Sequence, residues 1–309
     1  MTIVCEEVRA EPLPAPRNFS THTFTVQTFA RRTAALAVRS LLREAEAGPK
    51  PGLVDRFGSG AHTDMDIRHF RLSAAALGPY FARMVATCSP EALRNLGIEA
   101  ESAMLAATGG VNTHKGAIWT LGLLCAAAGS LVSGQPARRI TANPPAAELV
   151  CERAAEIARR ITGLPAPAVP QTRGQAARGA YGLRSARDEA VAGFPAILAR
   201  ALPLARSLRS GTVPEDERVI TVLLGAMAHA DDTCLVARGG IEALGYACRQ
   251  ASAVLDAGGP ASSDGAEIYA DMVRTFQAGR LSPGGAADLC AAALFLADLE
   301  AEPACHGHT

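Results

Sequence analysis

The stretch GGVNTHKGAIWTLGLLCAAAGSLVSG, residues 109–134, decides the fold of this chain. Its last eighteen residues, 117–134, carry no charge, so a helix over 114–133 would be apolar on every side and would have to be covered by other elements. The stretch stands alone and is rich in Ala, Gly, Ser and Thr, which favours the buried helix of a soluble bundle over a membrane span.

Working outward from this helix, alanine-rich segments repeat apolar residues at three- and four-residue steps. Strand-like alternation is seen mainly at 19–29. The sequence therefore predicts an all-α fold, a single compact domain of about ten helices. The expected helices are 27–47, 67–88, 90–107, 114–133, 146–161, 186–209, 215–237, 241–257, 265–279 and 284–300.

Three parts of the chain are expected around this domain: a mobile N-terminal segment at 1–25, the catalytic domain at 26–302 and a short tail at 303–309. A Pro-, Gly- and Arg-rich connection at 163–183 is long enough to be a functional loop. The first residues lack the apolar core of a signal peptide, and no C-x-x-C pair occurs among the eight cysteines. We therefore expect a cytoplasmic protein with reduced cysteines.

The balance of acidic and basic residues argues against nucleic acid and anionic membranes as partners of this chain. Thirty basic and thirty acidic residues give a formal net charge of zero, so the chain offers no general field for nucleic acid or for an anionic membrane. Any anion site must be local. Only two of the basic residues are lysines, Lys50 and Lys115, and both lie in segments dense in Gly, Pro, His and Asp. Such isolation favours positions that need a compact ammonium, although chance survival stays open.

The first cluster of chemically useful residues follows Lys50 and runs KPGLVDR, then GSGAHTDMD at 58–66. Asp64 and Asp66 are two residues apart in an irregular segment, so both carboxylates could turn toward one Mg²⁺. One of them could instead cap the helix that starts near Ile67, and both roles could coexist.

A second cluster, GGVNTHKG at 109–116, opens the apolar helix. Free backbone N–H groups at a helix start, together with His114 and Lys115, would suit phosphate oxygens. The Walker A spacing is missing, and an ordinary Thr-capped helix is the alternative.

The third cluster is His229-Ala230-Asp231-Asp232-Thr233, followed by Arg238. If it lies on a helix, one aspartate could reach a metal while its neighbour orients water or a basic side chain. A solvated acidic face is the alternative.

The fourth cluster is split between ARDEAVAGFP at 186–195 and LSPGGAADL at 281–289. Arg187 could clamp a phosphate and Glu189 could transfer a proton. Gly284 and Gly285 open another helix with free N–H groups. Arg187 and Glu189 could equally be exposed helix charges.

Taken together, the segments KPGLVDR, GAHTDMD, GVNTHKGAI, ARDEAVAGFP, DDTCLVARGG and LSPGGAADL closely resemble those of the triphosphoribosyl-dephospho-CoA synthases. Members of this family prepare the prosthetic group of bacterial citrate lyase and malonate decarboxylase. The resemblance spans about residues 45–298. The chain departs from the family pattern at Cys234 and Ala237, where Asn and His are expected.

The resemblance implies a glycosyl transfer from ATP. The 2′-hydroxyl of 3′-dephospho-CoA attacks the ribose carbon that carries adenine, adenine leaves, and the triphosphate stays on the transferred ribose. Such chemistry needs Mg²⁺, cations on the triphosphate, a base and a proton donor. The expected phosphate-binding residues are Lys50, Arg56, His114, Lys115, Arg187, Arg238, Gly284 and Gly285; the expected metal ligands are Asp64, Asp66, Asp231 and Asp232; and the expected acid–base residues are Asp55 or Glu189 as base and His62 as acid.

Two other function classes stay open at this point. A Mg²⁺-dependent helical hydrolase of ADP-ribose or phosphate esters would also use dispersed aspartate pairs. A non-catalytic helical scaffold explains poorly why His, Lys and Asp concentrate at helix joints. The sequence leaves open whether the chain forms a homodimer and which lyase or decarboxylase is served.

Overall fold

The computed structural model describes residues 19–133, 144–165, 179 and 181–301. Within these ranges the chain forms helices and no β-strand, only an isolated bridge between Asp55 and Gly58. The elements are α1 (Phe19–Glu46), α2 (Ile67–Val85), α3 (Pro90–Ala107), α4 (Lys115–Val132), α6 (Ala147–Thr162), α8 (Ala186–Val191), the π-helical turn η1 (Ile197–Ala201), α9 (Leu202–Ser207), α10 (Glu215–Met227), α11 (Thr233–Asp256), α12 (Ser263–Ala278) and α13 (Gly284–Ala301). The predicted all-α fold is confirmed.

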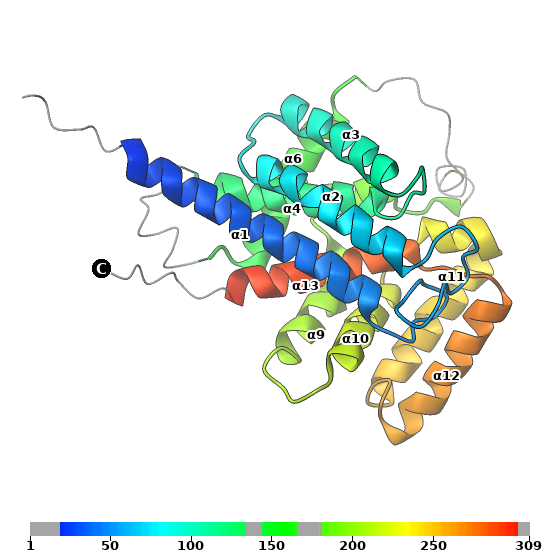
Figure 1. Cartoon of the computed structure of the whole chain (residues 1–309). Coiled ribbons are helices and arrows are strands. Elements are labelled where there is room, and N and C mark those ends of the chain that lie inside the picture. Colours follow the sequence, from blue (N-terminus) through cyan, green and yellow to red (C-terminus); the bar gives the residue numbers. More distant parts are fainter. Residues whose placement is uncertain (1–18, 134–143, 166–178, 180, 302–309) are drawn as a thin grey trace, which may run out of the picture.

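Two apolar helices form the centre of the bundle. Helix α4, the helix predicted from the opening stretch, is long and apolar enough to cross a membrane, yet 72% of it is buried inside the protein. It packs against α2, α6 and α13, and its glycines allow close approach: a Cβ on Gly129 would stand 1.8 Å from the carbonyl oxygen of Val85. Helix α13 packs against α1, α10 and α4 (Figure 1).

Three sequence expectations about helix limits were wrong. Residues 19–29, which alternate like a strand, belong to α1, which therefore begins inside the segment expected to be mobile. The predicted helix 186–209 is interrupted where Gly193 and Phe194 take positive φ angles, next to Pro195. A residue before proline is disfavoured in helical geometry, so this break carried a sequence signal.

The predicted helix 215–237 is also divided. Helix α10 ends at Met227, and α11 begins after Asp232, whose side chain accepts the N–H groups of Cys234 and Leu235. The predicted break between 237 and 241 lies inside α11 as a kink at Gly240, which has φ 71°. The expected segments 303–309 and most of 1–25 and 163–183 lie outside the described residues.

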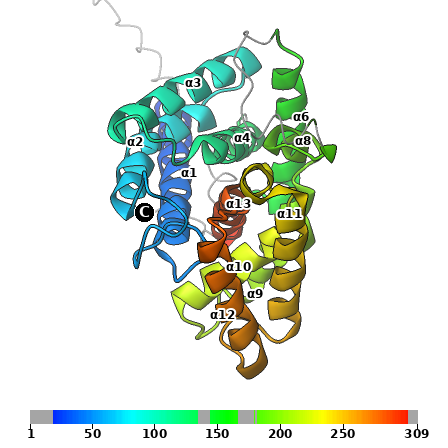
Figure 2. The same cartoon turned by 90° about the vertical axis from the view of Figure 1, so that its right-hand side faces the viewer.

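The connections that carry the sequence motifs lie at one end of the bundle. The loop after α1, the start of α13 and the start of α11 all lie on the side that faces the viewer in Figure 2. Close packing holds this end together, because a Cβ on Gly52 would stand 1.9 Å from the carbonyl oxygen of Leu281. Residues far apart in the sequence therefore meet at this end. We call the region around His62, Ser282, Arg238 and Asp232 the polar corner.

Candidate active site

The centre of this corner is His62. Its Nε2 lies 2.9 Å from Ser282 Oγ in the connection between α12 and α13, and its Nδ1 lies 3.4 Å from an Arg238 guanidinium nitrogen. Arginine can only donate, so the Arg238 contact requires Nδ1 to accept, whereas the Asp64 carboxylate, 3.5 Å from the same Nδ1, can only accept a hydrogen from it. Burial, and then the Arg238 charge, lower the pKa of His62, so the ring is neutral at pH 7.

Asp232 lies beside this connection and is 3% exposed. Its Oδ1 accepts the N–H groups of Cys234 and Leu235, and its Oδ2 accepts that of Ala286 at 2.9 Å. The Gly285 N–H also bonds to it. One carboxylate thus caps both α11 and α13. The Gly285 N–H, which was expected from the sequence to bind phosphate, is already bonded to this carboxylate. Gly284, next in line, faces the Cys234 sulfur.

Asp231 and Glu189 meet at Arg184. The backbone N–H and Nε of Arg184 both donate to Asp231 Oδ2 at 3.0 Å, and the same guanidinium lies 3.6 Å from Glu189 Oε2. Glu189 is 6% exposed, and its Oε1 accepts the Ala196 N–H at 2.7 Å. Burial raises the pKa of Glu189, which suits a carboxylate that accepts a proton during a reaction. The expectation that both aspartates lie on a helix was wrong, because Asp231 is in the connection and Asp232 caps α11.

The exposed guanidinium of Arg187 lies 5.7 Å from the ring centre of Trp119 in α4. The Trp119 indole N–H donates to the Ala186 carbonyl at 3.1 Å, which fastens the start of α8 to α4. The Arg187 guanidinium is therefore exposed to solvent beside the half-buried ring of Trp119.

The two lysines occupy different environments. The Lys50 side chain is 1% exposed and its Nζ donates to Glu44 Oε1 at 2.7 Å and to the Glu44 carbonyl at 2.5 Å. The Lys115 side chain is 52% exposed and lies 2.5 Å from Glu101 Oε1. Only Lys115 is open to an incoming phosphate.

Asp55 is buried and organises its own loop. Its Oδ2 accepts the Lys50 N–H at 2.8 Å, while its Oδ1 accepts those of Phe57 and Gly58. These three bonds engage both carboxylate oxygens of Asp55, so the geometry favours Glu189 over Asp55 as the base.

His114 is the N-cap residue of α4, directly before its first residue Lys115, and is 3% exposed. Its Nδ1 lies 2.7 Å from Ser73 Oγ in α2, and Thr113 does not cap the helix, so the Thr-capped alternative was wrong. Asn112 Oδ1 accepts the Lys115 N–H instead. Burial, and then the Lys50 charge, lower the pKa of His114 to about 3, so any contact with phosphate would be a neutral hydrogen bond.

The four aspartates expected to share a metal do not gather. Asp66 caps α2 and pairs with Arg68, and Asp64 is exposed and 3.5 Å from His62 Nδ1. Asp231 and Asp232 hold the partners given above. In the part of the chain that the structure describes, no three His, Cys, Asp or Glu side chains come close enough to hold a metal ion. The acidic segments border one corner, but the donor set does not fit a protein cage for Mg²⁺.

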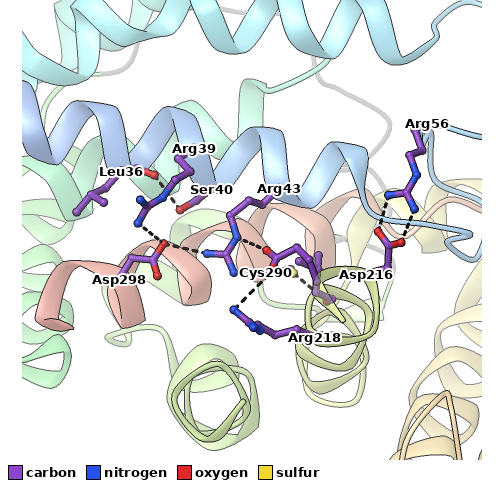
Figure 3. Close-up of polar contacts among 11 residues, drawn as sticks. Leu36, Arg39, Ser40, Arg43, Arg56, Asp216, Arg218, Cys290 and Asp298 are labelled. Atoms are coloured by element: carbon purple, nitrogen blue, oxygen red, sulfur yellow. Dashed lines mark hydrogen bonds and ion pairs between the residues drawn. The ribbon is translucent and has the colours of Figure 1, made fainter. Parts of the chain in front are cut away.

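Arg56 lines a groove of about 870 Å³ along α1. Its guanidinium is bidentate to Asp216 of α10, and Arg39 and Arg43 both bind Asp298 of α13, as Figure 3 shows. These arginines fasten α1 and its loop to α10 and α13. Of the predicted site residues, only Arg56 lines this groove.

Sequence reasoning missed Asp288, Ser282 and Arg184. Asp288 of α13 accepts the Ala117 N–H at the start of α4, and a Cβ on Gly116 would stand 1.9 Å from its Oδ2. Burial, and then the charges of Glu44 and Asp232, raise the pKa of Asp288 well above its usual value. The motif LSPGGAADL contains both Ser282 and Asp288, so this signal was available, whereas nothing in the sequence pointed to Arg184.

This helical bundle, with imidazole, guanidinium and carboxyl groups gathered around helix starts, defines an all-α enzyme of the class that acts on phosphorylated substrates. The ATP:dephospho-CoA triphosphoribosyl transferase family model matches residues 30–305, and the chain belongs to this family.

Relatives agree with this assignment. The chain is 44% identical over 284 residues to the "Probable 2-(5''-triphosphoribosyl)-3'-dephosphocoenzyme-A synthase" of Azotobacter vinelandii, covering 88% of this chain and 93% of that one. It is 43% identical over 277 residues to the protein of the same name from Stutzerimonas stutzeri, covering 86% and 91%. A crystal structure from Archaeoglobus fulgidus, named for triphosphoribosyl-dephospho-CoA synthase, superposes with a TM-score of 0.50 at 16% identity, covering 74% of this chain and 97% of that one. That likeness supports the fold.

Proposed function

We propose that this chain transfers the triphosphoribosyl group of ATP to the 2′-hydroxyl of 3′-dephospho-CoA and releases adenine. The family assignment over residues 30–305 carries this proposal. The product would be the prosthetic-group precursor of malonate decarboxylase or citrate lyase, made in the cytoplasm.

In the proposed reaction the bond from the ribose C1′ to adenine breaks while a bond from C1′ to the acceptor oxygen forms. Glu189 would take the proton of the attacking 2′-hydroxyl, supported by its burial and raised pKa. His62, the predicted acid, would hydrogen-bond the leaving adenine, and adenine would take its proton from water, because a neutral imidazole is too weak an acid to give up its only N–H hydrogen. Lys115, Arg187 and Arg238 would bind the triphosphate, since all three side chains are exposed and cationic.

We further propose that Mg²⁺ enters with the triphosphate of ATP. Magnesium bound in this way needs only one or two carboxylates beside phosphate oxygens. Asp64 suits that role best, because its carboxylate is 63% exposed and it is the least engaged of the four predicted aspartates.

The test is a reaction of the full chain with ATP, Mg²⁺ and dephospho-CoA. Free adenine should appear only when dephospho-CoA is present, and mass spectrometry should find a CoA derivative heavier by one triphosphoribosyl unit. Release of phosphate or of ADP without adenine would refute the proposal and favour the hydrolase.

A further inference from the structure

One buried polar atom near this corner has no partner. Among the described residues, His114 Nε2 is one of three buried side-chain nitrogen or oxygen atoms without a hydrogen bond. Native proteins rarely leave such an atom unsatisfied, and the exceptions occur where a ligand or water is bound. The atom belongs to a motif already associated with phosphate binding, and it lies at the start of the eighteen-residue helix α4.

The rest of the ring is held firmly. Ser73 Oγ holds Nδ1 at 2.7 Å, and the Phe70 ring meets the imidazole edge-on with centroids 5.1 Å apart. The His114 N–H points to Met104 Sδ at 3.2 Å. Since Nε2 lies on the other side of the ring from Nδ1, it cannot share the Ser73 contact. The surroundings therefore fix the ring and leave one atom for something else.

The direction of the Ser73 contact is tied to the tautomer of the ring. The ring is neutral, so exactly one of its nitrogens carries hydrogen. When the Ser73 hydroxyl donates to Nδ1, the hydrogen sits on Nε2, which becomes a donor. Lys50, although paired with Glu44, is the charged side chain that acts on this ring, and an Nε2–H donor suits a phosphate oxygen as acceptor.

We infer that Ser73 and His114 act as a pair in which Ser73 positions the ring and His114 Nε2–H donates to a phosphate oxygen of the nucleotide substrate. This inference rests on the proposed use of ATP. It adds Ser73 of α2, outside all six motifs, to the residues on which substrate binding depends.

The first experiment reads the tautomer without any turnover. In the full chain labelled with ¹⁵N-histidine, His114 should show a protonated Nε2 and an unprotonated Nδ1, and adding inorganic tripolyphosphate should shift the Nε2 resonance. A hydrogen on Nδ1, or an Nε2 resonance that saturating tripolyphosphate leaves unchanged, would overturn the inference even if the enzyme transfers triphosphoribosyl groups normally.

The second experiment uses steady-state adenine release. His114→Asn keeps a polar group near Ser73 but removes Nε2, and the KM for ATP should rise about 10- to 100-fold, as for loss of a hydrogen bond to a charged group. Ser73→Ala should raise the same KM, and Ser73→Thr should restore it in part. The matched control is Ser40→Ala, because Ser40 is also a buried helix serine but bonds the Leu36 carbonyl of its own helix (Figure 3).

Wild-type KM values in both His114→Asn and Ser73→Ala would refute the pair. An equal rise in Ser40→Ala would also refute it, because the effect would then come from general loss of a buried hydroxyl. Absence of adenine release by the wild type would instead contradict the proposed function, and the tautomer measurement would still decide the inference.

Discussion

The loop before α2 and the loop that leads into α4, counted here up to residue 116 in the first turn of that helix, each carry one of the two lysines, and they use it in opposite ways. In the first loop Lys50 lies inside the protein against Glu44 of α1, while Asp55 accepts three backbone N–H groups. In the second loop Lys115 is exposed and pairs with Glu101 of α3. The same residue type thus builds the corner in one loop and faces solvent in the other. An isolated lysine in an arginine-rich chain marks a special position, but its surroundings decide its task.

The largest effect expected from this difference is on folding. Lys50→Met should lower the free energy of unfolding by about 3–5 kcal/mol, because it leaves the Glu44 carboxylate buried without its partner. Urea denaturation measures this loss. The double variant Lys50→Met/Glu44→Gln should recover much of it. If the unfolding free energy of the single variant is within about 1 kcal/mol of the wild-type value, Lys50 is not a structural ion-pair partner.

For Lys115 the expected effect is on activity. Lys115→Ala should reduce kcat/KM for ATP about 10- to 100-fold. This corresponds to a loss of about 1.5–3 kcal/mol in transition-state stabilisation, as is usual for a hydrogen bond to a charged group. Its unfolding free energy should change by no more than about 1 kcal/mol, because an exposed ion pair contributes little. Glu101→Gln is the control, since it removes the ion pair and keeps the ammonium. If Lys115→Ala and Glu101→Gln lose the same activity, the loss comes from breaking the Lys115–Glu101 ion pair and not from a contact of Lys115 with ATP.

Gly116 tests how tightly the second loop is joined to α13. Gly116→Ala would place a Cβ 1.9 Å from Asp288 Oδ2, and such overpacking typically costs about 1–3 kcal/mol. Gly97→Ala is the control, because nothing lies within 4 Å of its added Cβ, and it should stabilise α3 by about 0.5–1 kcal/mol. Thermal unfolding of both variants measures the difference, and equal behaviour would mean that the start of α4 can shift freely.

The smallest expected effect links the two loops. The Lys50 charge lowers the pKa of His114, but burial is the larger cause. In the Lys50→Met/Glu44→Gln variant the pKa of His114 should therefore rise only slightly from about 3, as followed by NMR titration. Because this pKa lies below the unfolded value, the ring stabilises the fold above about pH 6.5, and that stability is lost as pH falls toward 3. A return to an ordinary histidine pKa in the variant would make the charge, not burial, the main cause.

The sequence was sufficient for the helices and for the order of the motifs, because apolar periodicity and glycine positions are local properties. The kink at Gly240 falls at the pair Gly239-Gly240, in the interval where the sequence placed a break between two helices. The tasks of the polar residues depended on partners far away in the chain, such as Asp232 with Ala286 and His114 with Ser73. No spacing rule could have paired those residues.

Local capping explains the main difference at the acidic residues. Asp66 and Asp232 look like metal ligands in sequence, yet the carboxylate of each accepts hydrogen bonds from the first N–H groups of a helix. The motif Asp-Asp-Thr at 231–233 already contains a capping signal, which the apolar pattern over 215–237 obscured.

Asp232 also has a dynamic consequence. Because its two oxygens join the first turns of α11 and α13, displacement of this one carboxylate frees the first N–H groups of both helices. The amide hydrogens of Cys234, Leu235, Gly285 and Ala286 should therefore report the same opening free energy in hydrogen exchange, although about fifty residues separate the two pairs along the chain. A single carboxylate makes two distant segments into one cooperative unit.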